Sequence, residues 1–195
     1  MLKLILNKKY NPLFSSEARY FIITGGRGSG KSFAVTVFLT LLTMTKGIRI
    51  LFTRYTMTSA HLSIIPEFLE KIGLLGFDEV FNINKAEVVN TSNQSDILFR
   101  GIRTSAGNQT ASLKSLQGIS TWVLDEAEEL VDENIFDTID LSIREKNIHN
   151  RVVLILNPVT KEHWIYKRFF EDKGVEGGFN GFKDNVCYIH TSYLD

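Results

Sequence analysis

Residues 20–32 of this 195-residue chain read YFIITGGRGSGKS. An apolar run rich in β-branched residues, typical of a buried strand, is followed by a match to G-x-x-x-x-G-K-[ST], and a helical pattern begins at Lys31. In such a unit the glycines let backbone N–H groups surround a phosphate, and the helix points its positive end at the same anion. The stretch therefore predicts a phosphate-binding loop; the alternative is a glycine-rich turn without a ligand.

The motif predicts a role for each of the polar side chains in the loop. Lys31 is expected to bridge the β- and γ-phosphates of ATP, and the Ser32 hydroxyl to take one position on Mg²⁺. Arg27 could turn toward the γ-phosphate and stabilise charge in the transition state, or remain a surface arginine. The nucleotide-binding residues predicted for this segment are Gly25, Gly26, Arg27, Gly28, Ser29, Gly30, Lys31, Ser32 and Phe33.

Outward from this stretch, short apolar runs alternate with helical patterns along the whole chain. This alternation predicts an α/β fold of the P-loop NTPase type, with a mainly parallel sheet covered by helices on both faces. Around residues 80–100 the pattern breaks into alternating pieces, which predict a small antiparallel insertion at one edge. The further strands are expected at 48–52, 97–99, 121–124 and 152–156, and the helices at 31–45, 58–72, 132–144 and 161–170.

Length and composition limit the alternatives. We expect residues 1–195 to form a single domain, with 44% hydrophobic residues to build its core. Lys and Arg total 22 and Asp and Glu total 22, so no global basic field indicates a nucleic-acid or membrane partner. No apolar run approaches the length of a membrane span and residues 1–7 are too short for a secretion signal, which favours a cytoplasmic protein. A single cysteine, Cys187, excludes an internal disulfide and a cysteine-based zinc cage.

A second motif, TWVLDE at residues 121–126, places two carboxylates after a buried run. We expect Asp125 to anchor Mg²⁺ through water, and Glu126 to orient and deprotonate the water that attacks the γ-phosphate. The adjacent pair favours an ATP-hydrolysing motor over a GTPase switch or a nucleotide kinase. The alternative is an acidic helix cap, with Glu128 and Glu129 extending a solvated face.

A third polar position follows the apolar run 151–156, which ends in Asn157-Pro158. Ligands of open parallel sheets bind outside the carboxyl ends of the strands, so the Asn157 amide could contact the γ-phosphate or the attacking water. It would then sense whether that phosphate is present. Alternatively, Asn157 only opens a turn with Pro158.

Taken together, these residues resemble the ATPase domain of the large terminase subunit, the DNA-packaging motor of tailed bacteriophages. The resemblance spans about residues 10–195 and is carried by three sets of residues in order. They are residues 25–32 with the internal arginine, KSLQGIS at 114–120 leading into WVLDEAE at 122–128, and LNP at 156–158 followed by HWIYKRF at 163–169.

The resemblance implies the additional-strand, catalytic-glutamate type of P-loop fold and Mg²⁺-dependent ATP hydrolysis that moves double-stranded DNA into a procapsid. It supports Arg27 as a γ-phosphate sensor and Asn157 as part of the coupling motif, although the family often has hydroxyl residues there. It implies adenine contacts from the residues before the first strand, namely Tyr10, Asn11 and Phe14. The C-terminal nuclease domain of the family is expected to be absent from this chain.

The implied partners are double-stranded DNA, the portal protein and the small terminase subunit. We expect a homo-oligomeric ring on assembly, although the isolated chain could be a monomer. The expected location is the host cytoplasm, where the protein docks transiently on the procapsid and is not retained in the mature virion. Ring ATPases commonly take a catalytic arginine from the neighbouring subunit. Arg144 is the first choice for it, ahead of Lys114 and Arg103, and each is otherwise a solvated surface charge.

Two other functions are compatible with the same residues. A helicase-like translocase would share the phosphate site but needs base-stacking or strand-separating elements, which the sequence between Asp125 and Asn157 does not show. An assembly module that binds ATP without hydrolysing it would not need Glu126. A phosphate-release assay separates this second alternative from the motor.

Overall fold

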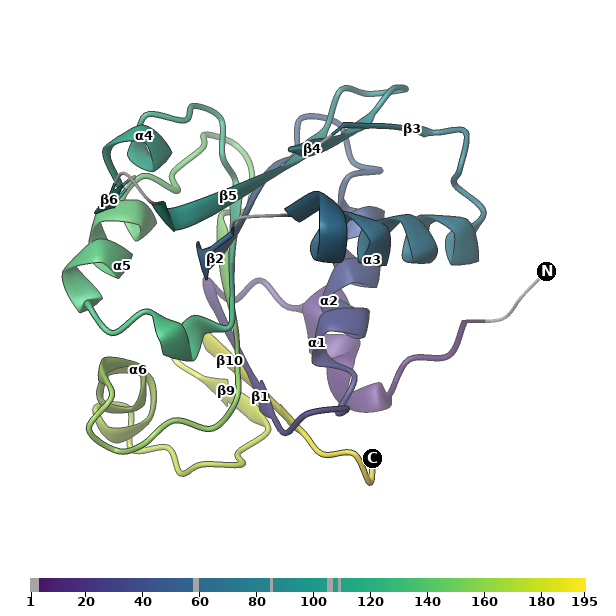
Figure 1. Ribbon diagram of the computed structural model, residues 1–195. Coiled ribbons are helices and arrows are strands. Elements are labelled where there is room, and N and C mark those ends of the chain that lie inside the picture. The colour runs from purple at the N-terminus through teal and green to yellow at the C-terminus, as the bar shows by residue number, and fades with distance from the viewer. Residues whose placement is uncertain (1–3, 58–59, 85, 105–106, 109) are drawn as a thin grey trace.

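The strand that leads into the predicted phosphate loop lies inside a large mixed sheet (Figure 1). The computed structural model describes residues 4–57, 60–84, 86–104, 107–108 and 110–195. The strands are β1 Tyr20–Gly25, β2 Arg49–Thr56, β3 Phe81–Ile83, β4 Glu87–Asn90, β5 Asp96–Thr104, β6 Gly107–Asn108, β7 Thr121–Asp125, β8 Arg151–Leu156, β9 Gly181–Lys183 and β10 Val186–Thr191.

The sheet confirms the expected α/β architecture. Its order is β3-β4-β5-β2-β7-β8-β1-β10-β9, with β6 paired to β5. All pairings from β5 through β2, β7, β8 and β1 to β10 are parallel, and the antiparallel strands lie at the two margins. Because β8 separates β1 from β7, one additional strand lies between the two motif-bearing strands, as the additional-strand type of P-loop fold requires.

Helices cover both faces of the sheet, with α1, α2 and α3 on one side and α4, α5 and α6 on the other (Figure 1). Strand β1 shows how two cores form, because Phe21 and Ile23 pack in the first layer and Ile22 in the second. The helices are α1 Asn11–Ser15, α2 Lys31–Leu42, α3 Ala60–Leu75, α4 Thr110–Lys114, α5 Glu133–Asp140 and α6 Trp164–Tyr166, with 3₁₀ turns η1 Lys8–Tyr10 and η2 Ala127–Glu129 and a π-helical turn η3 Lys167–Glu171.

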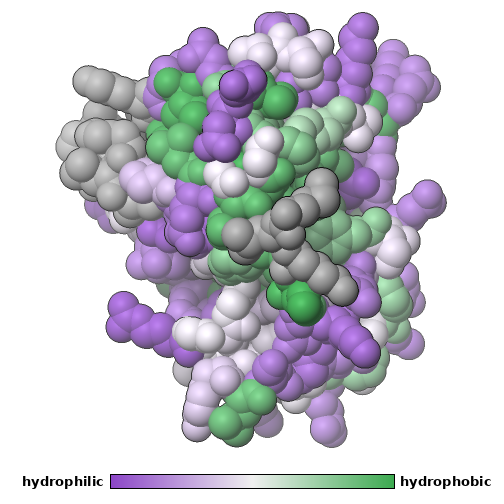
Figure 2. Space-filling view, turned by 90° about the vertical axis from the view of Figure 1, so that its right-hand side faces the viewer, coloured by the Kyte–Doolittle hydropathy of each residue, from purple (hydrophilic) through white to green (hydrophobic). Residues whose placement is uncertain are grey.

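The face that carries α1 to α3 keeps some apolar surface. Figure 2 shows apolar atoms near its centre, framed by hydrophilic side chains. Phe14 of α1 packs edge-on against Phe38 of α2 but remains 44% exposed, and Leu41 of α2 is also exposed. Apolar surface of this extent is common on soluble domains.

The elements differ from the sequence-based expectations at several points, which include the unexpected α1, α4 and β9 and the earlier end of α5, at Asp140. Strand β10 is absent from those expectations, yet it pairs with β1 along its whole length. The insertion is antiparallel at β3 and β4 as predicted, but β5 runs parallel to β2 and belongs to the main sheet. The helix expected at 161–170 is the short α6 followed by the π turn η3, and the expected start of α3 at residues 58–59 lies outside the described residues.

Candidate active site

Three of the predicted motifs meet at the carboxyl edge of the parallel strands. The loop after β1, the end of β7 and the end of β8 surround one cavity of about 760 Å³. Parallel strands bring their carboxyl ends to the same edge, which explains why segments distant in sequence converge there. The lining residues are Gly26, Arg27, Gly28, Ser29, Gly30, Lys31, Ser32, Arg54, Asp125, Glu126, Glu128, Ile155, Leu156 and Asn157.

The phosphate loop is shaped by glycines at two points. A Cβ on Gly25 would lie 2.2 Å from the Thr191 carbonyl oxygen of β10, so only glycine fits beside that strand. Gly30, the N-cap of α2, has φ +81°, a left-handed conformation that favours glycine. Together these residues bend the chain sharply from β1 into α2, as the motif predicted.

The Lys31 ammonium folds back over its own loop. Its Nζ donates to the carbonyl oxygens of Gly25 at 2.5 Å and Gly26 at 3.0 Å. Partial burial lowers the pKa of Lys31, and the carboxylates of Glu128 and Asp125 oppose that shift. A compact cation that already lies among backbone dipoles can move to phosphate oxygens with little change in its surroundings.

The two predicted carboxylates differ in exposure. The Asp125 side chain is 6% exposed, whereas that of Glu126 is 45% exposed. Glu126 has φ +54°, a left-handed conformation that is uncommon outside glycine and is often found at functional sites. Burial raises the pKa of Glu126; Arg54 opposes this shift and Asp125 adds to it. A carboxyl group with a raised pKa suits a general base better than an ordinary one.

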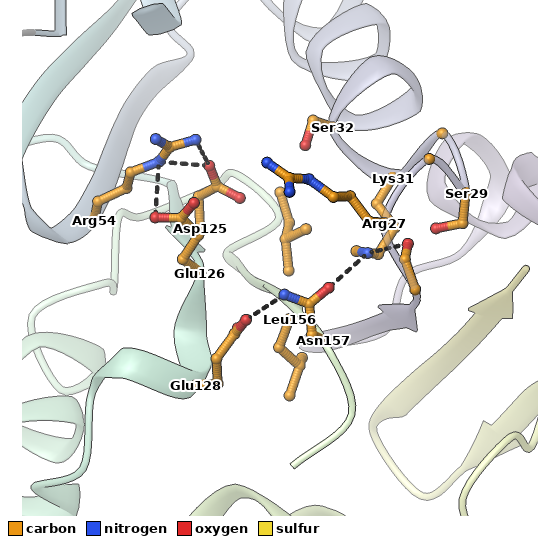
Figure 3. Close-up of a pocket in the computed structure, with 14 residues that line it drawn as sticks. Arg27, Ser29, Lys31, Ser32, Arg54, Asp125, Glu126, Glu128, Leu156 and Asn157 are labelled. Atoms are coloured by element: carbon orange, nitrogen blue, oxygen red, sulfur yellow. Dashed lines mark hydrogen bonds and ion pairs between the residues drawn. The ribbon is translucent and has the colours of Figure 1, made fainter. Parts of the chain in front are cut away.

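Arg54 belongs to the site although no sequence motif pointed to it. It lies in β2, and its Nε and Nη2 bind Asp125 Oδ2 at 2.8 and 2.6 Å, while Nε lies 3.7 Å from Glu126 Oε2 (Figure 3). The strand expected from the sequence ends at residue 52, two positions earlier. Only the pairing of β2 with β7 brings this arginine to the carboxylates, and no local pattern signals that pairing.

Asn157 connects the loop with the opposite wall. Its Oδ1 lies 3.4 Å from Lys31 Nζ, and its Nδ2 donates to Glu128 Oε1 at 2.6 Å (Figure 3). The structure therefore brings Asn157 to the phosphate side of the cavity, as predicted. Glu128, which the sequence suggested only as part of a solvated face, lines the cavity as well.

Arg27 and Ser32 complete the loop side. The exposed Arg27 extends from the loop toward the carboxylates, and the Ser32 hydroxyl lies at the start of α2 (Figure 3). A hydroxyl and a carboxylate are the hard oxygen ligands that Mg²⁺ accepts beside phosphate and water. Ser32 and Asp125 line the same cavity, so the residues present fit the predicted metal.

A second cavity, of about 240 Å³, adjoins the loop on its other side. Tyr10 and Phe33 line it, together with Asn7 and Tyr193, which were not predicted. The Tyr10 hydroxyl donates to the Ser29 carbonyl oxygen at 3.0 Å and is 2.8 Å from Thr191 Oγ1. The other two residues expected to contact adenine, Asn11 and Phe14, are not among the described residues that line either cavity; the Phe14 ring packs against Phe38 instead.

Arg144 lies beyond the amino ends of the parallel strands, on the side of the sheet away from the phosphate loop. It precedes β8 and lines a separate cavity of about 350 Å³ with Lys114, Gly118 and Glu145. From this side Arg144 cannot reach the phosphate loop of its own chain. Any role in hydrolysis would therefore be on a neighbouring subunit, which is the role expected for it from the sequence.

The chain matches a known protein family over most of its length. The family model described as phage terminase large subunit matches residues 17–195. The chain belongs to the phage terminase large subunit family. Among curated relatives, the PBSX phage terminase large subunit of Bacillus subtilis (strain 168) is 26% identical over 174 residues, covering 85% of this chain and 38% of that protein.

Solved terminase structures share the fold. The large terminase of a thermophilic bacteriophage aligns with a TM-score of 0.74 and 12% identity, over 98% of this chain and 47% of that one. The N-terminal domain of the DNA packaging ATPase of bacteriophage phi29 aligns with a TM-score of 0.66 and 17% identity, over 95% and 96% of the two chains. This terminase chain spans less than half the length of the curated relatives it matches. Among its described residues, no helix combines the length and apolarity of a membrane span.

Proposed function

We propose that this chain is a Mg²⁺-dependent ATPase that powers the movement of double-stranded phage DNA into a procapsid. The observation that carries the proposal is the cavity in which the phosphate loop of residues 25–32 faces Asp125 and Glu126. Family membership supports the DNA-packaging role. Structures of the same thermophilic phage's large terminase in complex with ADP and with ATP-gamma-S support the choice of nucleotide.

The residues divide the reaction between them. The loop N–H groups and Lys31 hold the β- and γ-phosphates, and Ser32 and Asp125 would hold Mg²⁺, which neutralises phosphate charge when bound. Glu126 orients a water and takes its proton as the water oxygen attacks the γ-phosphorus. The bond to the β–γ bridging oxygen then breaks, and ADP and phosphate result. Arg27 and Asn157 line the same cavity, which supports the assignment of both to contacts with the γ-phosphate.

A phosphate-release assay of the purified chain tests this proposal. We expect ATP hydrolysis that requires Mg²⁺, stops with EDTA and is lost in Lys31→Ala. Binding of ATP without any release of phosphate, even at high protein concentration, would favour the assembly module that does not hydrolyse ATP. Stimulation by single-stranded but not double-stranded DNA would favour the helicase-like translocase.

We propose a homo-oligomeric ring that acts with the portal protein and the small terminase subunit in the host cytoplasm, on the procapsid. An arginine supplied across the interface contributes on the order of 10³ in rate in related chemistry, so the isolated chain should be a weak ATPase. In a forced oligomer, mixing Arg144→Ala with Lys31→Ala chains should restore activity at shared interfaces. High, concentration-independent activity of the wild-type monomer together with no restoration would show that Arg27 completes the site alone.

A further inference from the structure

Glu128 is a third carboxylate at the phosphate site that the proposed reaction does not use. It lies in η2, directly after the strand that bears Asp125, and lines the main cavity. Its Oε1 accepts a hydrogen bond from Asn157 Nδ2 at 2.6 Å, while its Oε2 is buried and has no hydrogen-bond partner among the described residues. A buried carboxylate oxygen without a partner is costly and calls for an explanation.

The contacts of Asn157 fix which way its amide points. The Lys31 ammonium can only donate and an ionised Glu128 can only accept, so the amide oxygen must face Lys31 and the amide nitrogen must face Glu128. Turning the amide over would bring donor to donor and acceptor to acceptor. Glu128 thus ties down the group that would otherwise donate to a γ-phosphate.

The backbone around Glu128 is held in place by residues at the start of α6, which pack in the same core layer. His163 Nδ1 accepts from the Ile165 N–H at 3.2 Å, so its Nε2 carries the proton and donates to the Glu128 carbonyl oxygen at 3.1 Å. Trp164 Nε1 donates to the Leu130 carbonyl oxygen at 2.5 Å. Because η2 is anchored in this way and Asn157 is exposed, a separation of the two groups requires rotation of the Asn157 side chain rather than movement of η2.

We propose that Glu128 is a positioning residue that keeps the Asn157 amide nitrogen bound until a γ-phosphate competes for it, and so lowers the preference of the site for ATP over ADP. This inference rests on the proposed function. A phosphate oxygen and the Glu128 carboxylate compete for the same amide nitrogen, and both interactions are charge-assisted. ADP lacks the γ-phosphate, so Asn157 remains bound to Glu128 when ADP occupies the loop. Only ATP has to displace the carboxylate.

The test compares Kd values for a non-hydrolysable ATP analogue and for ADP, measured by calorimetry with Mg²⁺. In Glu128→Gln the charge-assisted contact becomes a neutral one, so the ratio Kd(ADP)/Kd(ATP analogue) should rise roughly three- to tenfold. Glu128→Asp keeps the charge but withdraws it by one methylene, and should raise the ratio in the same direction. Glu129→Gln removes the same charge from the exposed neighbour, which is not among the lining residues of the cavity, and should leave the ratio unchanged.

A double-mutant cycle shows whether the effect passes through Asn157. In an Asn157→Ala background, Glu128→Gln should no longer alter the ratio. If Glu128→Gln still raises the Kd ratio in the Asn157→Ala background, or if Glu129→Gln raises it equally, Glu128 acts only by repelling the phosphate charge and the inference is overturned. A wild-type chain that binds neither nucleotide contradicts the proposed function itself. Normal wild-type binding with an unchanged ratio in Glu128→Gln and Glu128→Asp contradicts only the role of Glu128; melting curves confirm that each variant is folded.

Discussion

The two walls of the nucleotide cavity are built in different ways. The phosphate wall is one contiguous segment, residues 25–32, in which Lys31 contacts backbone carbonyls of its own loop. The carboxylate wall is assembled from the ends of three strands, and its side chains are paired, Arg54 with Asp125 and Asn157 with Glu128. The first wall is formed mainly by local backbone geometry, with β10 and Tyr10 packed against it, whereas the side chains of the second wall come together only when the strands of the sheet have paired.

The largest effect is expected on the phosphate wall. Lys31→Ala removes the compact cation that would bridge the β- and γ-phosphates, so nucleotide binding or hydrolysis should be lost. Equilibrium ATP binding and phosphate release measure it. Lys46→Ala, at an exposed position away from the cavity, is the matched control and should behave as wild type. Wild-type turnover in Lys31→Ala would contradict the assignment of the loop.

Glu126→Gln examines the chemistry of the carboxylate wall. Hydrolysis should fall by roughly 10² to 10⁴, the usual contribution of a general base, while binding of ATP and Mg²⁺ remains close to wild type. Single-turnover phosphate release, together with a binding titration, separates the two quantities. If Asp125→Asn spared Mg²⁺ binding while Glu126→Gln destroyed it, the roles of the two carboxylates would be reversed.

Arg54→Ala tests whether the carboxylate wall depends on its ion pair. Without Arg54 the buried Asp125 carboxylate loses its cation, so the free energy of unfolding should fall by about 3 kcal/mol. Arg49→Ala is a close control, because Arg49 also lies in β2 and also binds an aspartate, but its side chain is 41% exposed. Its loss should cost about 1 kcal/mol or less. Equal losses in urea unfolding would show that the pair at the cavity has no special role.

The smallest effect is expected at Tyr10, whose side chain packs against the phosphate loop outside the main cavity. Tyr10→Phe removes the hydroxyl that joins the Ser29 carbonyl oxygen to Thr191, which should cost about 1 kcal/mol of stability. Thermal unfolding measures it. Tyr166→Phe, whose hydroxyl has no hydrogen-bond partner within the described part of the chain, should leave the melting temperature unchanged. A larger loss in Tyr166→Phe than in Tyr10→Phe would contradict this account.

The contrast between the walls also explains what the sequence could predict. The loop, the adjacent carboxylates and the position of Asn157 follow from contiguous patterns, and so does the alternation of strands and helices. Arg54 and Glu128 enter the site only through strand pairing and a turn, which local patterns do not encode. Strand β10 was missed because a glycine-rich segment separates its residues from the helix expected at 161–170, and because its pairing with β1 is a long-range contact.

The pairing of β1 with β10 has a consequence for a protein under load. The segments at the two ends of the chain meet beside the phosphate loop, through the pair of Lys9 with Asp195 and the contact of Tyr10 with Thr191. Tension applied to the two ends would first separate these contacts. The force would then act along two parallel strands with six residue pairs in register, from Tyr20 with Val186 to Gly25 with Thr191. Those hydrogen bonds would be sheared together rather than opened one at a time, so the strand that leads into the phosphate loop would resist this tension along its whole length.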